Sequence, residues 1–485
     1  MAMLMLPRFL VLQVGNKYLS VTENLPASLP SGFVKFDEEQ IWSPRVKFAV
    51  EQAESGDGRL VHIRSCYNNK YLVTNLIQTN LWLVASAEKP EEDTSKASCT
   101  LFEPHAFLGE TNVRLRHIHT RNPASYWPSS GGFVPSADTQ HGILVSVLST
   151  TGQVFSPNDW ERLVILPSQV SFRSEDLDGN YLVSRVIDRW YNYHRFESGM
   201  DIGDPLVAHE LFPTADGNYR IKNLHFGKFW RRSPNWIWAD AQDNNNSNDT
   251  LFSFVKISDG VIALRNLGNN NFCGGLTTEG KTNCLNAQYP TIVRQARLMV
   301  EERVLQREIS DLRYRLSDSR IYQEEILEVS HAFATNDSLD NETTITLSYS
   351  SSDSRTTYWN NSVSLTFGVQ IEFKTTIIPF ISEATVQVST EFGYAHEWGV
   401  EKTTERTREA SYTVVVPPST TIKVSLMCTR AACDVPFSYM QRDLLTNGEW
   451  VTTQKDDGIY TGINSYNFYF QSSNVVQDDQ GRMYV

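Results

Sequence analysis

The amino-acid sequence predicts an all-β protein in which two tandem β-trefoil domains are followed by a third, elongated β-domain. Over the first 300 residues, short alternating apolar segments are separated by turns rich in Gly, Asn, Asp and Ser, which is the pattern of short strands. The same segments then recur in a second copy. After residue 300, longer period-2 alternation and dense Ser and Thr replace them.

The first 300 residues contain one domain twice. Corresponding segments keep their order along the chain: residues 58–64 match 217–222, residues 81–85 match 235–239, and residues 99–102 match 249–252. Such self-similarity indicates a duplicated domain. We expect the first copy at residues 1–153 and the second copy at residues 169–300. Residues 154–168 are expected to be a short helical linker, with a capped turn over 156–163.

Each copy also contains an internal repeat. The Asn-Lys-Tyr-Leu segment at residues 16–19 returns at residues 69–72, and a third strand pair follows near residues 113–118. Threefold repetition of a hairpin within about 150 residues indicates a β-trefoil, a closed arrangement that hides its strand edges.

Composition excludes several classes of function. Lys and Arg number 43 against 56 Asp and Glu, so the net charge is −13, and no basic cluster is present. This argues against nucleic acid as a partner and against simple electrostatic docking on anionic lipid. The sequence contains no run of about 18 apolar residues, so it predicts no transmembrane helix. The six cysteines are scattered, which predicts buried free thiols and no disulfide scaffold.

The third domain, expected at residues 301–485, contains a regular amphipathic alternation at residues 363–392. Apolar residues stand at every second position from Val363 to Phe373 and again from Ala384 to Val388, with polar residues between them. The segment between the two arms is expected to be the hairpin turn, and it consists only of apolar residues: Ile377, Ile378, Pro379, Phe380 and Ile381. A soluble hairpin has a polar turn.

A membrane accounts for the arms and the turn together. A spanning strand needs about 9–11 residues, and lipid-facing residues alternate with polar residues that face the lumen. Because a single hairpin leaves its backbone edges unpaired in hydrocarbon, several chains must close a barrel together. The alternative is an ordinary hairpin whose apolar face packs on a protein core.

Two resemblances to known families sharpen these expectations. Residues 60–73, the Trp82-Leu-Val-Ala-Ser-Ala87 segment, the acidic turn at 91–93 and residues 99–104 resemble the amaranthin-like agglutinins. The resemblance covers about residues 8–300. It implies β-trefoil lectin domains that bind galactose and N-acetylgalactosamine in glycans of the T-antigen type, and contacts between subunits. It also implies a plant protein made without a signal peptide and kept in cytoplasm and nucleus.

The third domain resembles the pore-forming module of aerolysin-type proteins. The resemblance rests on the Ser/Thr-rich alternation, on residues 397–407 and on residues 412–424. It implies an elongated β-domain whose insertion loop, at about 363–392, leaves the soluble form and builds an oligomeric barrel. Two agglutinin domains followed by such a module resemble plant chimeric lectins of the same order.

Candidate sugar-binding residues follow from the first resemblance, which implies that the loop after the second Lys-Tyr-Leu-Val carries the sugar. That loop spans residues 74–82, and its candidate residues are Asn75, Gln78, Asn80 and Trp82. Planar amides suit sugar hydroxyls and an aromatic face suits the C–H patch of galactose. For Trp82, a place in the core and a contact with sugar are equally expected. In the second copy the equivalent candidates are Asn235 and Trp236.

The leading functional interpretation is a galactose- and N-acetylgalactosamine-binding protein that targets glycosylated membranes and oligomerises into a β-barrel pore, in plant defence. Its expected partners are such glycans, a lipid membrane and further copies of itself, as a dimer or a ring. The alternative is a multivalent lectin whose third domain mediates only oligomerisation or stress-related interactions. No hydrolase, metalloprotease, P-loop or dinucleotide motif is present, so we expect no enzyme, no cofactor and no metal. The N-terminal apolar run carries Arg8 and lacks the features of a signal peptide. We expect synthesis in cytoplasm or nucleus and action at foreign or damaged membranes.

Overall fold

The computed structural model describes residues 6–23, 25–106, 112–126, 142–145, 154–189, 191–361, 369–390, 396–477 and 483–484. In this part of the chain strands dominate, and each helix is a three-residue 3-10 turn. The predicted all-β class is therefore confirmed. Within the described residues no helix is long and apolar enough to cross a membrane. The chain forms two units, one with residues 1–308, 362–370 and 441–453 and the other with the remaining residues.

The first copy consists of twelve described strands and two 3-10 turns. They are β1 (Phe9–Val14), β2 (Lys17–Val21), β3 (Val34–Glu38), η1 (Pro44–Val46), β4 (Phe48–Gln52), β5 (Val61–Ser65), β6 (Tyr71–Ile77), β7 (Asn80–Ala87), β8 (Leu101–Ala106), β9 (Val113–His117), β10 (Ala124–Tyr126), β11 (Ile143–Val145), β12 (Ser156–Asp159) and η3 (Trp160–Arg162).

Six of these strands form a barrel, and three hairpins cover one end of it. The barrel strands pair in the order β12, β1, β4, β5, β8 and β9, and a bridge between Val113 and Phe155 closes the ring. The hairpins β2–β3, β6–β7 and β10–β11 are the three internal repeats. A buried apolar cluster with Leu10, Phe36 and Phe102 fills the interior.

The region between the copies differs from the expected helical linker. Residues Ser156–Asp159 form β12, which pairs with β1 and so belongs to the barrel of the first copy. Only residues 160–162 form a helical turn, and Asp159 caps it by accepting the backbone N–H of Glu161. The cap is therefore Asp159, because Ser156 is already used by the strand.

The second copy repeats the arrangement. Its elements are β13 (Gln169–Ser174), β14 (Tyr181–Ile187), β15 (Tyr191–Glu197), η4 (Pro205–Val207), β16 (His209–Pro213), β17 (Tyr219–Asn223), β18 (Lys228–Ser233), β19 (Trp236–Ala241), η5 (Asn248–Thr250), β20 (Phe252–Ser258), β21 (Val261–Asn266), β22 (Phe272–Thr278), β23 (Lys281–Tyr289), η6 (Arg294–Ala296) and β24 (Arg297–Glu302).

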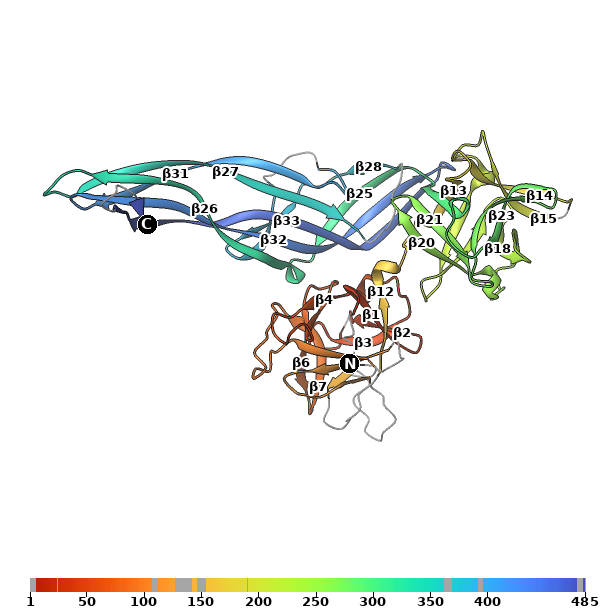
Figure 1. Cartoon of the computed structure of the whole chain (residues 1–485), viewed down its shortest axis with the longest axis horizontal. Coiled ribbons are helices and arrows are strands. Elements are labelled where there is room, and N and C mark those ends of the chain that lie inside the picture. The colour runs from red at the N-terminus through yellow and green to blue at the C-terminus, as the bar shows by residue number, and fades with distance from the viewer. Residues whose placement is uncertain are drawn as a thin grey trace. The chain divides into compact units, whose positions relative to one another are not determined.

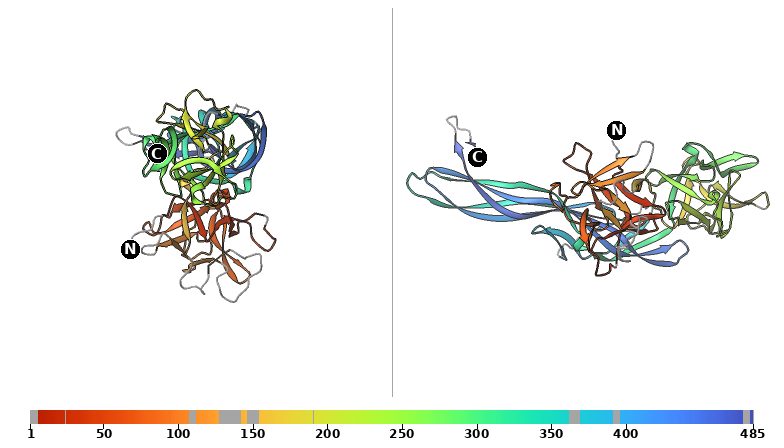
Figure 2. Two further views of the ribbon diagram at one scale, coloured as in Figure 1. Left: turned by 90° about the vertical axis from the view of Figure 1, so that its right-hand side faces the viewer. Right: turned by 90° about the horizontal axis from the view of Figure 1, so that it is seen from below.

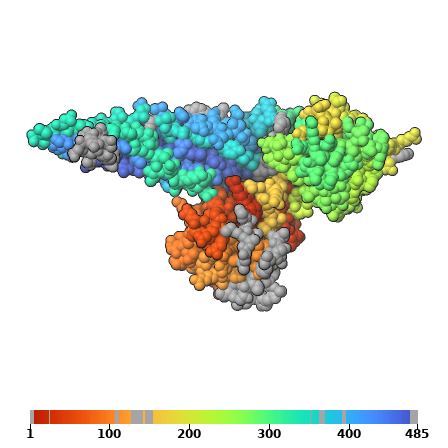
Figure 3. All heavy atoms as spheres, in the orientation of Figure 1, coloured from red at the N-terminus to blue at the C-terminus, as the bar shows by residue number. Residues whose placement is uncertain are grey.

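Its barrel closes completely through the pairings of β13, β16, β17, β20, β21 and β24. The hairpins β14–β15, β18–β19 and β22–β23 cover one end, and β15, β19 and β23 pair with one another where the hairpins meet. In the space-filling view the second copy is a solid body of atoms on the face shown (Figure 3). The threefold hairpin repetition predicted a β-trefoil for both copies, and the structure confirms it.

The third region is built from much longer strands. They are β25 (Val304–Tyr314), η7 (Leu316–Asp318), β26 (Arg320–Asn336), β27 (Thr343–Asn360), β28 (Gln370–Phe373), β29 (Ile378–Ser382), β30 (Thr385–Ser389), β31 (Lys402–Val416), β32 (Thr420–Leu445), β33 (Trp450–Asn474), β34 (Val476–Gln477) and β35 (Met483–Tyr484). Figure 1 shows β26, β27, β31, β32 and β33 as extended ribbons, and Figure 2 shows them from two further directions.

The main sheet of this region has the strand order β28, β25, β32, β33, β27, β31, with β26 also paired to β32. Two apolar clusters lie along it, one around Trp359, Phe437 and Tyr460 and the other around Val416 and Val424. The strands β29 and β30 form a separate two-stranded sheet. This small sheet contains the apolar segment that the sequence analysis singled out.

Candidate functional site

The candidate sugar loop of the first copy is the end of the hairpin β6–β7. Ile77 pairs with Asn80 and Asn75 pairs with Trp82, so Gln78 and Thr79 form a two-residue turn. Gln78 has a φ of +58°, as such a tight turn requires. Asn75 and Asn80 are half-buried and Gln78 is exposed. The structure therefore brings the three predicted amides together at one hairpin end.

Trp82 lies in the core, which is the second of the two roles considered for it. Its side chain is 1% exposed and packs in a small cluster with Leu29, Phe33 and Val84. The ring centroids of Phe33 and Trp82 are 5.9 Å apart. Strand β7 is buried on both faces over residues 82–85, so the sequence offers no alternation that would reveal which way Trp82 points. The ring presents no free face to a sugar.

The second-copy candidates divide in the same way. Trp236 is buried in a cluster with Tyr193 and Cys284, and its indole N–H donates to a carboxylate oxygen of Glu279 at 3.1 Å. Asn235 is exposed at the end of the hairpin β18–β19. Trp82 and Trp236 thus occupy matching positions, each in a hairpin that covers its barrel.

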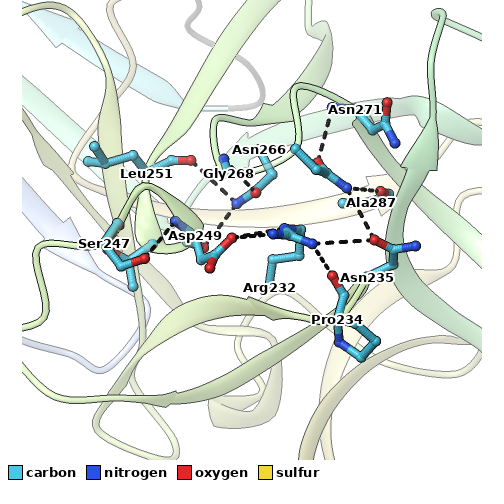
Figure 4. Close-up of polar contacts among 12 residues, drawn as sticks. Arg232, Pro234, Asn235, Ser247, Asp249, Leu251, Asn266, Gly268, Asn271 and Ala287 are labelled. Atoms are coloured by element: carbon cyan, nitrogen blue, oxygen red, sulfur yellow. Dashed lines mark hydrogen bonds and ion pairs between the residues drawn. The ribbon is translucent and has the colours of Figure 1, made fainter.

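Asn235 belongs to a polar network on the surface of the second copy (Figure 4). Its side-chain oxygen accepts from Asn269 Nδ2 at 3.2 Å and from Arg232 Nη1 at 3.4 Å. Arg232 also forms an ion pair with Asp249 at 2.6 Å. Asn269 Nδ2 donates to the carbonyl oxygen of Ala287 at 2.7 Å. The network fixes the loop around Asn235 and leaves the side-chain amide group of Asn235 as the part that can donate to a ligand.

Two further aromatic residues of this copy are not among the predicted site residues. Tyr191 on β15 stacks on Trp238 of β19, with ring centroids 4.5 Å apart and an interplanar angle of 26°. Tyr191 is 44% exposed, and Trp238 is half-buried. The alternating aromatic pairs Tyr191/Tyr193 and Trp236/Trp238 are the signal in the sequence. The meeting of the two pairs depends on the pairing of β15 with β19.

In the third region the apolar segment forms a strand, so the expectation of an apolar turn is wrong. Ile378 pairs with Ser389 and Ser382 pairs with Thr385. The turn consists of Glu383 and Ala384, which have φ values of +49° and +60°. Two consecutive positive values are typical of the type I′ turn, which matches the twist of a two-residue hairpin. We call residues 378–389 the packed hairpin.

The packed hairpin buries its apolar residues against the third region. Ile378 and Ile381 are buried in the cluster that contains Trp359 and Tyr460, and Val386 packs at its edge. The preceding strand β28 pairs with β25 and directs Ile371 and Phe373 at the same cluster. In this form, therefore, Ile371, Phe373 and Val386 of the predicted arms pack on protein, whereas Val388 is exposed. Residues 363–368 and 391–392 of the arms lie outside the described residues.

Among the described residues the packed hairpin forms a sheet of its own, and side chains attach it to the main sheet. The hydroxyl of Tyr460 and the guanidinium of Arg355 donate to the carbonyl oxygen of Pro379 at 2.8 and 3.0 Å. Asn464 accepts from the backbone N–H of Ile381 and donates to its carbonyl oxygen, both at 2.9 Å. Burial raises the pKa of Tyr460, which keeps the hydroxyl protonated as a donor.

A cavity of about 730 Å³ borders the packed hairpin on one side, lined by Phe380, Glu383, Arg355, Arg406 and Tyr466 among others. Close packing makes interiors rigid, so an open flank weakens the restraint on a strand. The hydrogen bonds of Tyr460, Arg355 and Asn464 and its own apolar residues thus hold the packed hairpin, with the cavity on one flank. Such a segment can separate from the sheet without unpairing any long strand.

Two closed trefoils followed by a long-stranded β-domain with a small packed hairpin define a modular all-β protein. Its sequence matches the agglutinin domain family at residues 4–134 and 167–301 and the aerolysin toxin family at residues 295–443. The agglutinin matches take in more than half of the chain, so the chain belongs to the agglutinin family. It is a pair of agglutinin domains joined to an aerolysin toxin domain, as the sequence resemblances predicted.

Several solved structures are similar to parts of the chain. The lamprey immune protein is 14% identical, with a TM-score of 0.31, and the match covers 65% of this chain and 93% of that one. The aerolysin-like protein of Bombina maxima is 11% identical, with a TM-score of 0.24 and coverages of 34% and 98%. The BEL β-trefoil is 16% identical, with a TM-score of 0.25 and coverages of 29% and 99%. No curated protein matches.

Proposed function

We propose that this protein binds glycans of the T-antigen type, with galactose or N-acetylgalactosamine, through its agglutinin domains. On the glycosylated membrane it then oligomerises into a β-barrel pore. The observation that carries the proposal is the packed hairpin: a short apolar strand pair, held mainly by side chains, in the domain that matches the aerolysin toxin family. Agglutinin domains supply the targeting, because tethering to a surface raises the local concentration for assembly.

The energetics of the hairpin support release and insertion. Each side-chain hydrogen bond contributes about 0.5–1.5 kcal/mol net, and burial of Ile378 or Ile381 about 1.5–3 kcal/mol. Insertion into a bilayer recovers the free energy of burying the apolar side chains, at about 0.8 kcal/mol per buried CH2. Because one hairpin leaves unpaired edges in hydrocarbon, the inserted form must be an oligomer. The arms supply the alternation that a barrel wall needs.

We also propose where the protein is made, where it acts and how it assembles. We propose synthesis in cytoplasm or nucleus, action at foreign or damaged membranes in plant defence, and a dimer or a ring as the assembly. Both matched families are typically non-enzymatic, and no step of the proposal needs catalysis, a cofactor or a metal.

Val388→Asp tests the pore. Val388 lies on the apolar face of the arm, yet it is 43% exposed in this form, so the substitution spares the fold, whereas an aspartate at the buried Ile378 would not. A carboxylate in the centre of a membrane segment costs about 3 kcal/mol, and the cost recurs in every subunit. We expect at least a tenfold slower release of dye from liposomes that carry Galβ1–3GalNAc glycolipid, with unchanged binding.

Gln387→Asp is the matched control, because Gln387 is the exposed neighbour on the polar face of β30. It is expected to release dye like the unmodified protein. If Val388→Asp releases dye as fast as the unmodified protein, the hairpin is not part of the pore. Binding of the unmodified protein without any release would favour a multivalent lectin whose third domain only mediates association.

A further inference from the structure

Four neighbouring strands of the second copy place aromatic and charged side chains side by side. In the sheet the order is β18, β19, β15, β23. Tyr191 on β15 and Trp238 on β19 form the stacked pair described above. Tyr193 adds an edge contact to Trp238, with ring centroids 5.7 Å apart. The result is an aromatic platform, Tyr191 and Trp238, of which Tyr191 is substantially exposed.

An ion pair lies on each side of the aromatic platform. On the β18 side, Arg231 pairs with Asp240 through two hydrogen bonds of 2.6 and 3.0 Å, and the guanidinium lies 5.7 Å from the centroid of Trp238. On the β23 side, Lys281 pairs with Asp188 at 3.0 Å and lies 5.9 Å from the ring of Tyr193. Arg231, Asp240 and Asp188 all keep about a third or more of their side chains exposed.

A second aromatic pair on the same domain, with one exposed ring, is built differently. Phe212 and Phe229 meet edge to face at an interplanar angle of 60°. Phe229 is buried and has two cations over its ring, Arg220 at 4.4 Å and Lys222 at 5.4 Å. Neither ring belongs to a near-parallel stack with an ion pair on each side. An exposed aromatic residue of this domain, such as Phe212, therefore need not have the arrangement found around Tyr191.

We propose that the Tyr191–Trp238 platform is a sugar-binding subsite for a neutral glycan that ends in galactose or N-acetylgalactosamine. The proposal rests on the glycan binding proposed above. The C–H face of the pyranose lies on the aromatic platform, which is the geometry that amphipathic sugar faces require. The two ion pairs donate to and accept from the hydroxyl groups around the ring. Since each cation is already neutralised by a carboxylate, the subsite favours a neutral sugar over a sialylated one.

The test is isothermal titration of the full chain with the free disaccharide Galβ1–3GalNAc and with its sialylated form. Tyr191→Ala removes the exposed ring, and Asn75→Ala with Asn80→Ala removes the candidate amides of the first copy. We expect Tyr191→Ala to abolish one binding site or weaken it at least tenfold. Tyr191→Phe keeps the ring, and Phe212→Ala is the matched control; both are expected to stay within threefold of the unmodified protein. The sialylated form is expected to bind the site at least tenfold more weakly.

The outcomes separate the two proposals. If Tyr191→Ala binds like the unmodified protein while the Asn75/Asn80 variant loses binding, the platform is overturned and glycan binding stands. If the unmodified chain binds neither disaccharide, the glycan-binding function fails and the platform fails with it. Equal binding of the sialylated form would overturn the neutral-sugar assignment. A melting temperature of Tyr191→Ala close to that of Phe212→Ala shows that the loss is one of recognition.

Discussion

The two agglutinin copies share a fold but differ in how they satisfy polar groups. At matching positions His117 ends β9 and Asn266 ends β21. His117 Nε2 donates to the carbonyl oxygen of Cys99 at 2.9 Å, and Asn266 Nδ2 donates to the carbonyl oxygen of Asp249 at 2.9 Å. The carbonyl can only accept, which fixes the hydrogen of His117 on Nε2. Two different side chains therefore perform the same task.

The buried histidines of the two copies differ more sharply. In the second copy His194 and His209 are fully buried against Trp230, with ring centroids 4.4 and 4.9 Å from it, and against each other, with centroids 5.5 Å apart. Within the described residues, neither ring nitrogen of His194 has a hydrogen-bond partner. The buried His62 of the first copy, in contrast, bonds to Thr100 and Glu92. The second copy thus tolerates one unpaired buried ring, but at a cost in stability that depends on its charge.

The largest effect we expect is from removing the tryptophan that matches between the copies. Trp82→Ala in the first copy and Trp236→Ala in the second each leave a cavity where the hairpins meet, and each is expected to cost about 3–5 kcal/mol. Differential scanning calorimetry of the full chain measures the loss, with the exposed Trp450→Ala as the control. If Trp82→Ala keeps its stability and loses binding to Galβ1–3GalNAc, then Trp82 contacts sugar and the two positions are not equivalent.

Alternation and duplication are local signals, and they predicted most of the fold. The period of two residues identified the strands. The matching segments at residues 81–85 and 235–239 then predicted that the trefoil occurs twice. The inward direction of Trp82 was not predictable, because β7 is buried on both faces. The Tyr191–Trp238 pair was missed because its members meet only through strand pairing.

The sequence predicted the turn of the packed hairpin at the wrong residues, again because the outcome depends on strand pairing. Pro379 is a common marker of turns, and it stands in the middle of the apolar segment. The structure accommodates Pro379 because β29 is an edge strand, where the missing N–H leaves no ladder bond unmade. Glu383 and Ala384 carry no strong turn signal in the sequence, although they adopt the positive φ values. Their conformation follows from the pairing of Ser382 with Thr385.

A second, smaller effect is a loss of stability of the second copy at low pH. Burial lowers the pKa of His209 to about 3 and lowers the pKa of His194 well below its usual value, with Arg303 adding to the effect on His209 and His209 adding to that on His194. Both rings must be neutral in the folded second copy. Their contribution to stability is present above pH 6.5 and is lost as the pH falls below 6.5, in the case of His209 down to about pH 3. Each ring costs about 1.4 kcal/mol per pH unit in that window.

Calorimetry of the full chain between pH 7.5 and pH 5 measures this loss. The transition of the second copy is expected to move further than that of the first. Burial also lowers the pKa of His117 in the first copy, but the bond to the Cys99 carbonyl offsets part of that shift. His194→Phe keeps a ring against Trp230 and is expected to reduce the pH dependence. A first copy that is the more acid-labile would contradict this account.

The smallest effect comes from exchanging the equivalent residues of the two copies. His117→Asn gives the first copy the side chain that the second copy uses at Asn266, and an amide donor can still reach the Cys99 carbonyl. His117→Leu has similar bulk and no donor, and it leaves that buried carbonyl unpaired. We expect His117→Leu to cost about 1–2 kcal/mol and His117→Asn to cost less, as measured by the transition of the first copy. Equal losses would mean that ring packing against Phe102, and not the hydrogen bond, is what the position requires.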